Sequence, residues 1–135
     1  EGGMIAVPPH AGVNAAANFT TTAEDYARFV IYTMNGAGLR EPLGNAIFEP
    51  QIKIDATKSF GLGWQLLHRP DNSPFAAQHS GADAGVRALA LAWPDKRQAV
   101  VILSNSENAI PTWGLIIEEA FGPDGAAAIR ANQPE

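Results

Sequence analysis

Apolar positions in the first third of the chain repeat with the period of a helix. They recur every three or four residues, at Ala23, Tyr26, Ala27, Val30 and Met34. The run Thr21–Glu24 has the spacing of a capping box, and Asn35-Gly36 is typical of a helix end. The pattern therefore predicts a helix from about Thr22 to Asn35.

The second half of the chain contains short apolar stretches separated by turn residues, which is typical of strands. The stretch around Phe60–Leu67 ends at a cluster of turn residues, Pro70–Pro74. A second stretch, Phe75–Ser80, is followed by small residues at Gly81–Gly85, which we interpret as a connection. These residues predict one strand, a turn and another strand.

Two further apolar stretches, Val86–Trp93 and Gln98–Ser104, flank the turn signal Pro94–Arg97 and predict a hairpin. Both stretches are almost continuously apolar, which favours a sheet that is covered on both faces. A helical cover is predicted to start at Pro111 and to end at Gly122-Pro123.

These elements predict an α+β fold. We expect an antiparallel sheet of three to four strands, with the C-terminal helix packed on it and an N-terminal helix plus loops. The length of 135 residues predicts a single domain. Residues 1–60 would supply the helix and loops, including a helical turn near Leu43–Phe48, and residues 60–122 the strands and the C-terminal helix.

Composition excludes several classes of function. The formal net charge is -5, and the basic residues are scattered singly, so nothing resembles a nucleic-acid interface. The longest apolar runs, Ala88–Trp93 and Ala99–Leu103, are far shorter than the roughly 20 residues of a membrane span. The absence of cysteine excludes disulfides, thiolate metal sites and a cysteine nucleophile.

Metal and cofactor signals are weak. The histidines His10, His68 and His79 lack ligand spacing, so we expect no metal site. The glycine pairs Gly36-Ala-Gly38 and Gly61-Leu-Gly63 lack the full spacing of a dinucleotide or phosphate loop. We therefore expect no cofactor.

The run Gln78–Gly81 is the strongest candidate for chemistry. On a strand, His79 and Ser80 point to opposite faces, so they cannot form a nucleophile and base pair. Without further context, His79 is a half-buried strand histidine and Ser80 a hydroxyl satisfied by backbone.

The wider context resembles a known superfamily. Phe60–Trp64, His79–Gly81 and Leu103–Asn105 occur in the order and spacing of the C-terminal part of serine β-lactamases and penicillin-binding proteins. The resemblance is greatest to the class C branch, with its β-lactamase-like esterases and D-amino-acid peptidases. It covers residues 18 to 122, including a helix at Phe19–Phe29, and implies a partial β-lactamase/transpeptidase-like fold.

The resemblance implies acyl-enzyme hydrolysis of an amide or ester. In the family a Ser-x-x-Lys motif attacks, Tyr-x-Asn assists, and a third motif lines the opposite wall. Here His79 would adjoin the proton-transfer network, and Ser80 would contact a substrate carboxylate or carbonyl. Ala82 would donate its backbone N–H to the oxyanion. Gly81 would let the substrate approach the strand, and Trp64 would contact it in the cleft.

The sequence also departs from the family. It contains no Ser-x-x-Lys, and neither Tyr26 nor Tyr32 has an asparagine two positions on. We therefore expect residues 1–135 to be a C-terminal fragment of a larger domain, inactive alone. The substrate stays open among β-lactams, cell-wall peptides, D-amino-acid amides and esters. Export to the periplasm or secretion is favoured by the resemblance, but the compartment is not fixed.

In the family, N-terminal strands pair beside the last strand, here 98–104. We therefore expect this edge to associate with the missing N-terminal portion or with a second copy. A competing hypothesis is a non-catalytic binding or assembly module derived from the same fold. Another is a small α+β domain with no site, in which the match at His79–Gly81 is coincidence.

Overall fold

The computed structural model describes residues 14–16 and 19–132. Its helices are α1 (Ala23–Met34), α2 (Leu43–Ala46) and α3 (Ile110–Ala131). The strands form one antiparallel sheet of six in sequential order. They are β1 (Ile52–Lys53), β2 (Lys58–Phe60), β3 (Gln65–His68), β4 (Pro74–Asp83), β5 (Val86–Trp93) and β6 (Gln98–Ser104).

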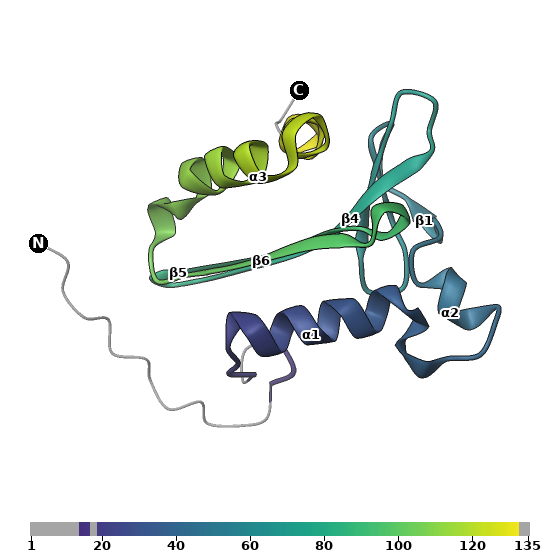
Figure 1. Cartoon of the computed structure of the whole chain (residues 1–135), viewed down its shortest axis with the longest axis horizontal. Coiled ribbons are helices and arrows are strands. Elements are labelled where there is room, and N and C mark those ends of the chain that lie inside the picture. Colours follow the sequence, from purple (N-terminus) through teal and green to yellow (C-terminus); the bar gives the residue numbers. More distant parts are fainter. Residues whose placement is uncertain (1–13, 17–18, 133–135) are drawn as a thin grey trace, which may run out of the picture.

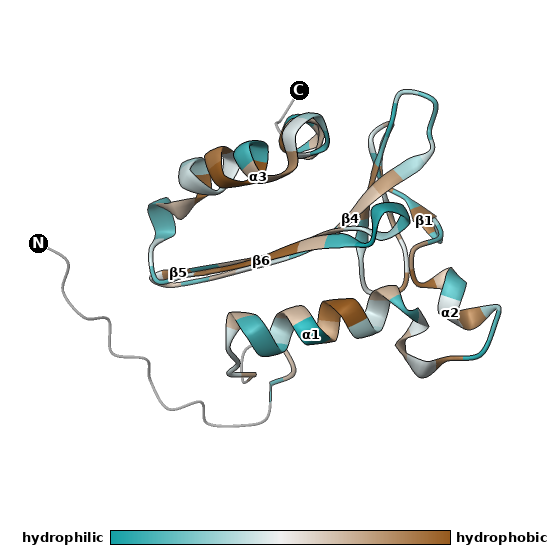
Figure 2. Ribbon diagram, in the orientation of Figure 1, coloured by the Kyte–Doolittle hydropathy of each residue, from teal (hydrophilic) through white to brown (hydrophobic). Residues whose placement is uncertain are grey.

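The sheet lies between two helices, α1 on one face and α3 on the other (Figure 1). Alternate strand residues therefore enter two separate cores. The α1 side buries Val30 with Leu66 and Ala90, and the α3 side buries Trp93 with Ile117. Figure 2 shows apolar residues along β5 and β6, the strands between the helices. The prediction of a sheet covered on both faces is confirmed.

Helix α1 begins and ends where its sequence signals predicted. The Thr22 hydroxyl accepts a hydrogen bond from the backbone N–H of Asp25 at 3.1 Å, which caps the first turn. Asn35 follows the last helical residue. The helix buries Val30 completely, so the predicted apolar stripe faces the sheet.

The α+β class and the antiparallel sheet are confirmed, but there are six strands where three to four were expected. The predicted strand Phe60–Leu67 is divided between β2 and β3 by a turn at Gly61–Trp64. Gly63 has φ 81°, and a Cβ on Gly61 would meet the Ile47 carbonyl oxygen. Only glycine fits this turn, which reverses the chain and adds two short strands.

Helix α3 continues past its predicted end. The backbone breaks at Gly122, with φ 54° and ψ -129°, and the helix resumes and runs to Ala131. After the break, Gly125 packs directly against the Ile117 carbonyl oxygen. Gly122-Pro123 is therefore a sharp bend between two helical segments.

Most of the N-terminal loop predicted for residues 1–19 lies outside the described residues, and so does His10. Among the helices that the structure describes, none has the length and apolar character to span a membrane.

Candidate functional site

We call residues His79–Ala82 the motif segment; they are His79, Ser80, Gly81 and Ala82. All four are exposed and lie within β4. The prediction that Gly81–Gly85 forms a connection was wrong, because β4 stays paired with β5 as far as Asp83↔Val86. Only Ala84 and Gly85 form the turn, where Gly85 has φ 75°.

The motif segment is paired on one edge only. Strand β3 pairs with β4 between Pro74 and Gln78, and it does not extend further. From His79 to Asp83, β4 pairs with β5 alone among the described strands. The other edge of this stretch is open, so its backbone groups are available to an extended partner.

The register indicates which backbone groups face the open edge. Asp83 and Val86 close a two-residue turn and are therefore a hydrogen-bonded pair. Pairing alternates along an antiparallel ladder, so Ala82 and Ser80 direct their N–H and C=O groups away from β5. These groups project from the open edge of the motif segment.

The side chains of the motif segment divide between the two faces of the sheet. His79 lies opposite Ala90, which belongs to the core on the α1 side. Ser80 lies opposite Leu89, which packs against the core on the α3 side. The register thus keeps the two side chains apart, as the strand geometry predicts.

A buried amide cluster anchors β4 just before the motif segment. Gln78 is 7% exposed, and its Nε2 donates to Gln65 Oε1 and to Asn132 Oδ1, both at 2.6 Å. Asn132 Nδ2 donates back to Gln78 Oε1 at 2.9 Å and to the Ala128 carbonyl at 3.0 Å. This cluster joins β3, β4 and the end of α3. No sequence pattern indicated a role for Gln78 or Asn132.

Two further contacts hold the turn after the motif segment. The backbone N–H of Gly85 donates to Glu107 Oε1 at 3.0 Å. Arg87 Nη1 donates to the carbonyls of Asp83 at 2.9 Å and Val86 at 2.8 Å. A surface hollow of about 860 Å³ lies here, with Gly81 and Ala82 in its lining. The motif segment is thus held from both ends.

Trp64 directly precedes Gln65, the residue at which β3 pairs with Gln78. It lies where β3 leaves β4, one position along from His79. The Trp64 ring is 5% exposed and packs 5.7 Å from the Phe48 ring, within the α1-side core. It borders the site from inside the core, and a direct contact with substrate stays a prediction.

A serine and a histidine do form a hydrogen bond elsewhere. Ser59 Oγ and His68 Nε2 are 2.7 Å apart, on neighbouring strands. Ser59 is only 1% exposed, so a substrate carbonyl cannot reach its hydroxyl. In the described part of the chain, no cluster of three or more histidine, cysteine or acidic residues is placed to hold a metal.

A family model described as Beta-lactamase matches residues 2–118 of the chain. The match covers most of the chain, so this protein belongs to the β-lactamase family. No curated protein matches its sequence.

Among solved structures, the chain is similar to the crystal structure of a penicillin binding protein from Bacillus halodurans. The two share 22% sequence identity with a TM-score of 0.65, which shows a common fold. The match covers 74% of this chain and 30% of that one, so this chain corresponds to under a third of the matched protein's length.

Proposed function

We propose that the motif segment is one wall of the substrate site of a serine hydrolase, which cleaves amides or esters through an acyl-enzyme. The observation that carries this proposal is the open edge of β4 at His79–Asp83. Membership of the β-lactamase family supports it.

In this proposal the backbone of the motif segment binds the reacting carbonyl. Ala82 offers an outward N–H to the oxyanion, a contact worth about 3 kcal/mol in the transition state. Ser80 contacts a substrate carboxylate or carbonyl, and His79 adjoins the proton-transfer network. A Cβ on Gly81 would meet only the Ala88 Cβ, at 3.9 Å, so packing does not require glycine here. Close approach of a substrate gives it a reason.

The nucleophile and its base are expected from other parts of a longer protein. The matched penicillin binding protein is more than three times the length that this chain covers, which supports that expectation. A non-catalytic binding module is the competing function, and the buried state of Ser59 is the observation in its favour. Such a module would bind without turnover.

Two glycine substitutions test the proposed wall. Gly81→Ala leaves β4 folded, because its new methyl group has room, but obstructs the approach of substrate. Gly114→Ala is the matched control, since a Cβ there has no neighbour within 4 Å. In the chain combined with the N-terminal portion, we expect Gly81→Ala to lower kcat/KM for nitrocefin or p-nitrophenyl acetate at least tenfold. Equal activity of the two variants would contradict the proposal.

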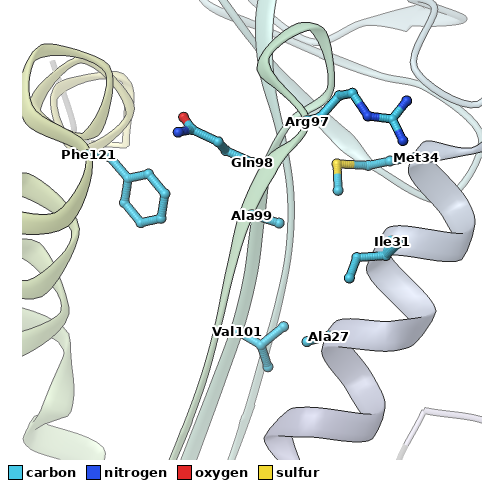
Figure 3. A pocket seen from close by; sticks show the side chains of 8 residues that line it. All are labelled: Ala27, Ile31, Met34, Arg97, Gln98, Ala99, Val101 and Phe121. Atoms are coloured by element: carbon cyan, nitrogen blue, oxygen red, sulfur yellow. The ribbon is translucent and has the colours of Figure 1, made fainter.

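We also propose that β6 accepts a strand from the N-terminal portion of the longer protein. Strand β6 ends the described sheet and pairs only with β5. Trp93 and Gln98 close the hairpin, so the ladder directs the backbone groups of Ala99, Val101 and Leu103 outward. Figure 3 shows the groove along this edge, with Ala27, Ile31 and Met34 on the α1 side and Phe121 on the α3 side.

The edge proposal predicts a specific loss of association. Val101→Pro removes an outward N–H without breaking the ladder to β5, so it should abolish binding of the N-terminal portion in analytical ultracentrifugation. Ile52→Lys alters β1 at the other end of the sheet and should leave binding unchanged. A wild-type chain that stays monomeric in the mixture at high micromolar concentration would contradict the proposal. A chain that only self-associates would replace this partner with a second copy.

A further inference from the structure

A second hollow lies at the opposite end of β4 from the motif segment. It has a volume of about 650 Å³, within the range of small-molecule sites. Its walls come from the loop before β2, from the turn between β3 and β4, and from the last turns of α3. Phe75 lies on its floor, about 17 Å along the strand from Ser80 at 3.3 Å per residue. The two sites are therefore separate.

The charges around this hollow favour an anion. Arg69 and Arg130 both line it, and neither forms an ion pair within the described residues. Asp124 also lines it, but its carboxylate is paired with Lys96.

Two acids nearby are used by their own loops. Asp55 Oδ1 accepts from the Thr57 backbone N–H at 2.7 Å and from the Thr57 hydroxyl at 2.9 Å. Asp71 Oδ1 accepts from the Ser73 N–H at 2.9 Å and its hydroxyl at 2.6 Å, and Asp71 also attracts Arg69. The hollow therefore keeps two guanidinium groups against one carboxylate that already has a partner.

The same hollow has an apolar floor. The Arg69 guanidinium lies over the Phe75 ring, 5.1 Å from its centroid, which restrains its planar group. Ala127 and Ala131 present methyl groups from α3. Arginine pairs with carboxylates through parallel N–H bonds, so cationic groups above an apolar floor fit an acid with an apolar body.

We propose that this hollow binds a small organic carboxylate whose apolar body lies on Phe75 and the alanines of α3. The ligand joins the turn between β3 and β4 to the end of α3, elements that otherwise meet through the amide cluster of Gln78 and Asn132. The inference is independent of the proposed hydrolase function, because none of these residues belongs to the motif segment.

The test is an NMR titration of the full chain at fixed ionic strength, with benzoate, acetate, inorganic phosphate and neutral benzamide as probes. We expect saturable benzoate shifts at residues 68–75 and 124–131 together. Acetate should bind at least fivefold more weakly, and benzamide should not bind. Phosphate as tight as benzoate, or benzamide as tight as benzoate, would overturn the proposal.

Variants locate the binding. The double variant Arg69→Gln with Arg130→Gln should weaken benzoate at least tenfold with an unchanged Tm, because both side chains are exposed. Arg40→Gln, an exposed arginine outside the hollow, and Ser80→Ala, in the motif segment, should have no effect. Benzoate affinity that survives the double variant would contradict the assignment.

Discussion

Gly81 and Gly125 lie within regular elements, yet the structure gives them different reasons to be glycine. A Cβ on Gly81 fits beside Ala88, whereas one on Gly125 would meet the Ile117 carbonyl oxygen and carbon. Glycine at position 125 therefore serves the packing of α3, and glycine at position 81 is free for another role. The motif identifies Gly81 in the sequence, but the close approach at Gly125 depends on the bend at Gly122, which only the fold reveals.

Gly125→Ala should therefore destabilise the protein. The added methyl group forces the two segments of α3 apart, and overpacking of this kind costs about 1 to 3 kcal/mol. Gly114→Ala has open space in the same helix and should be neutral or stabilising by up to about 1 kcal/mol. Urea denaturation of both variants measures the difference. Equal free energies of unfolding would contradict the packing described for Gly125.

Acid stability should depend on the two turn aspartates. The Ser73 hydroxyl and backbone N–H lower the pKa of Asp71, and the Thr57 N–H and hydroxyl lower the pKa of Asp55. A carboxyl with a lowered pKa in the fold binds protons more readily when unfolded, so its contribution is present above about pH 4 and is lost below it.

Replacing the titrating group tests this sign. Asp71→Asn keeps an acceptor for Ser73 but does not titrate, so the free energy of unfolding should fall less steeply between about pH 4 and pH 2. Asp95→Asn changes an aspartate with no side-chain hydrogen bond among the described residues and is the control. Chemical denaturation across this pH range measures both slopes. An Asp71→Asn slope as steep as the wild-type slope would show that Asp71 is not involved.

At the scale of elements, the predictable parts are those whose signals are local. Helix α1 carries its own cap at Thr22, and the hairpin of β5 and β6 carries its turn at Pro94–Arg97. Strands β1 and β2 have two and three residues, too few for a periodic pattern. They exist because the turn at Gly61–Trp64 returns the chain against β3, and that pairing is not written in either segment.

The second segment of α3 was also beyond local prediction. Gly122-Pro123 is typical of a helix end, and residues far away in the sequence hold the segment beyond it in place. Lys96 pairs with Asp124, and Gln78 bonds to Asn132. The same amide cluster anchors the strand that carries the motif segment. The motif residues were thus predictable from the sequence, whereas their support was not.

Asn132→Ala tests that support. It leaves the buried amide of Gln78 without its partner, at a cost of about 1 to 3 kcal/mol. Amide hydrogen exchange should accelerate in residues 123–131 and in β4, with a smaller effect on residues 110–121. Asn45→Ala, an exposed asparagine, is the control. Unchanged exchange in both regions would mean that the cluster does not join β4 to α3.

At the scale of the whole molecule, the sheet is covered on both faces but open at two backbone edges. The open stretch of β4 carries the motif segment, and the open edge of β6 lies between α1 and α3 (Figures 1 and 3). The chain covers 30% of a penicillin binding protein of the same fold. We interpret both edges as contact surfaces of a larger protein, one for substrate and one for the rest of the fold.

The most direct test measures turnover of nitrocefin and p-nitrophenyl acetate by this chain alone and after mixing with the N-terminal portion of the longer protein. We predict no turnover by the chain alone, because its described residues offer no accessible serine with a base. We predict turnover in the mixture. Activity of the chain alone would mean that another residue attacks, and a stoichiometric complex without turnover would favour the binding module.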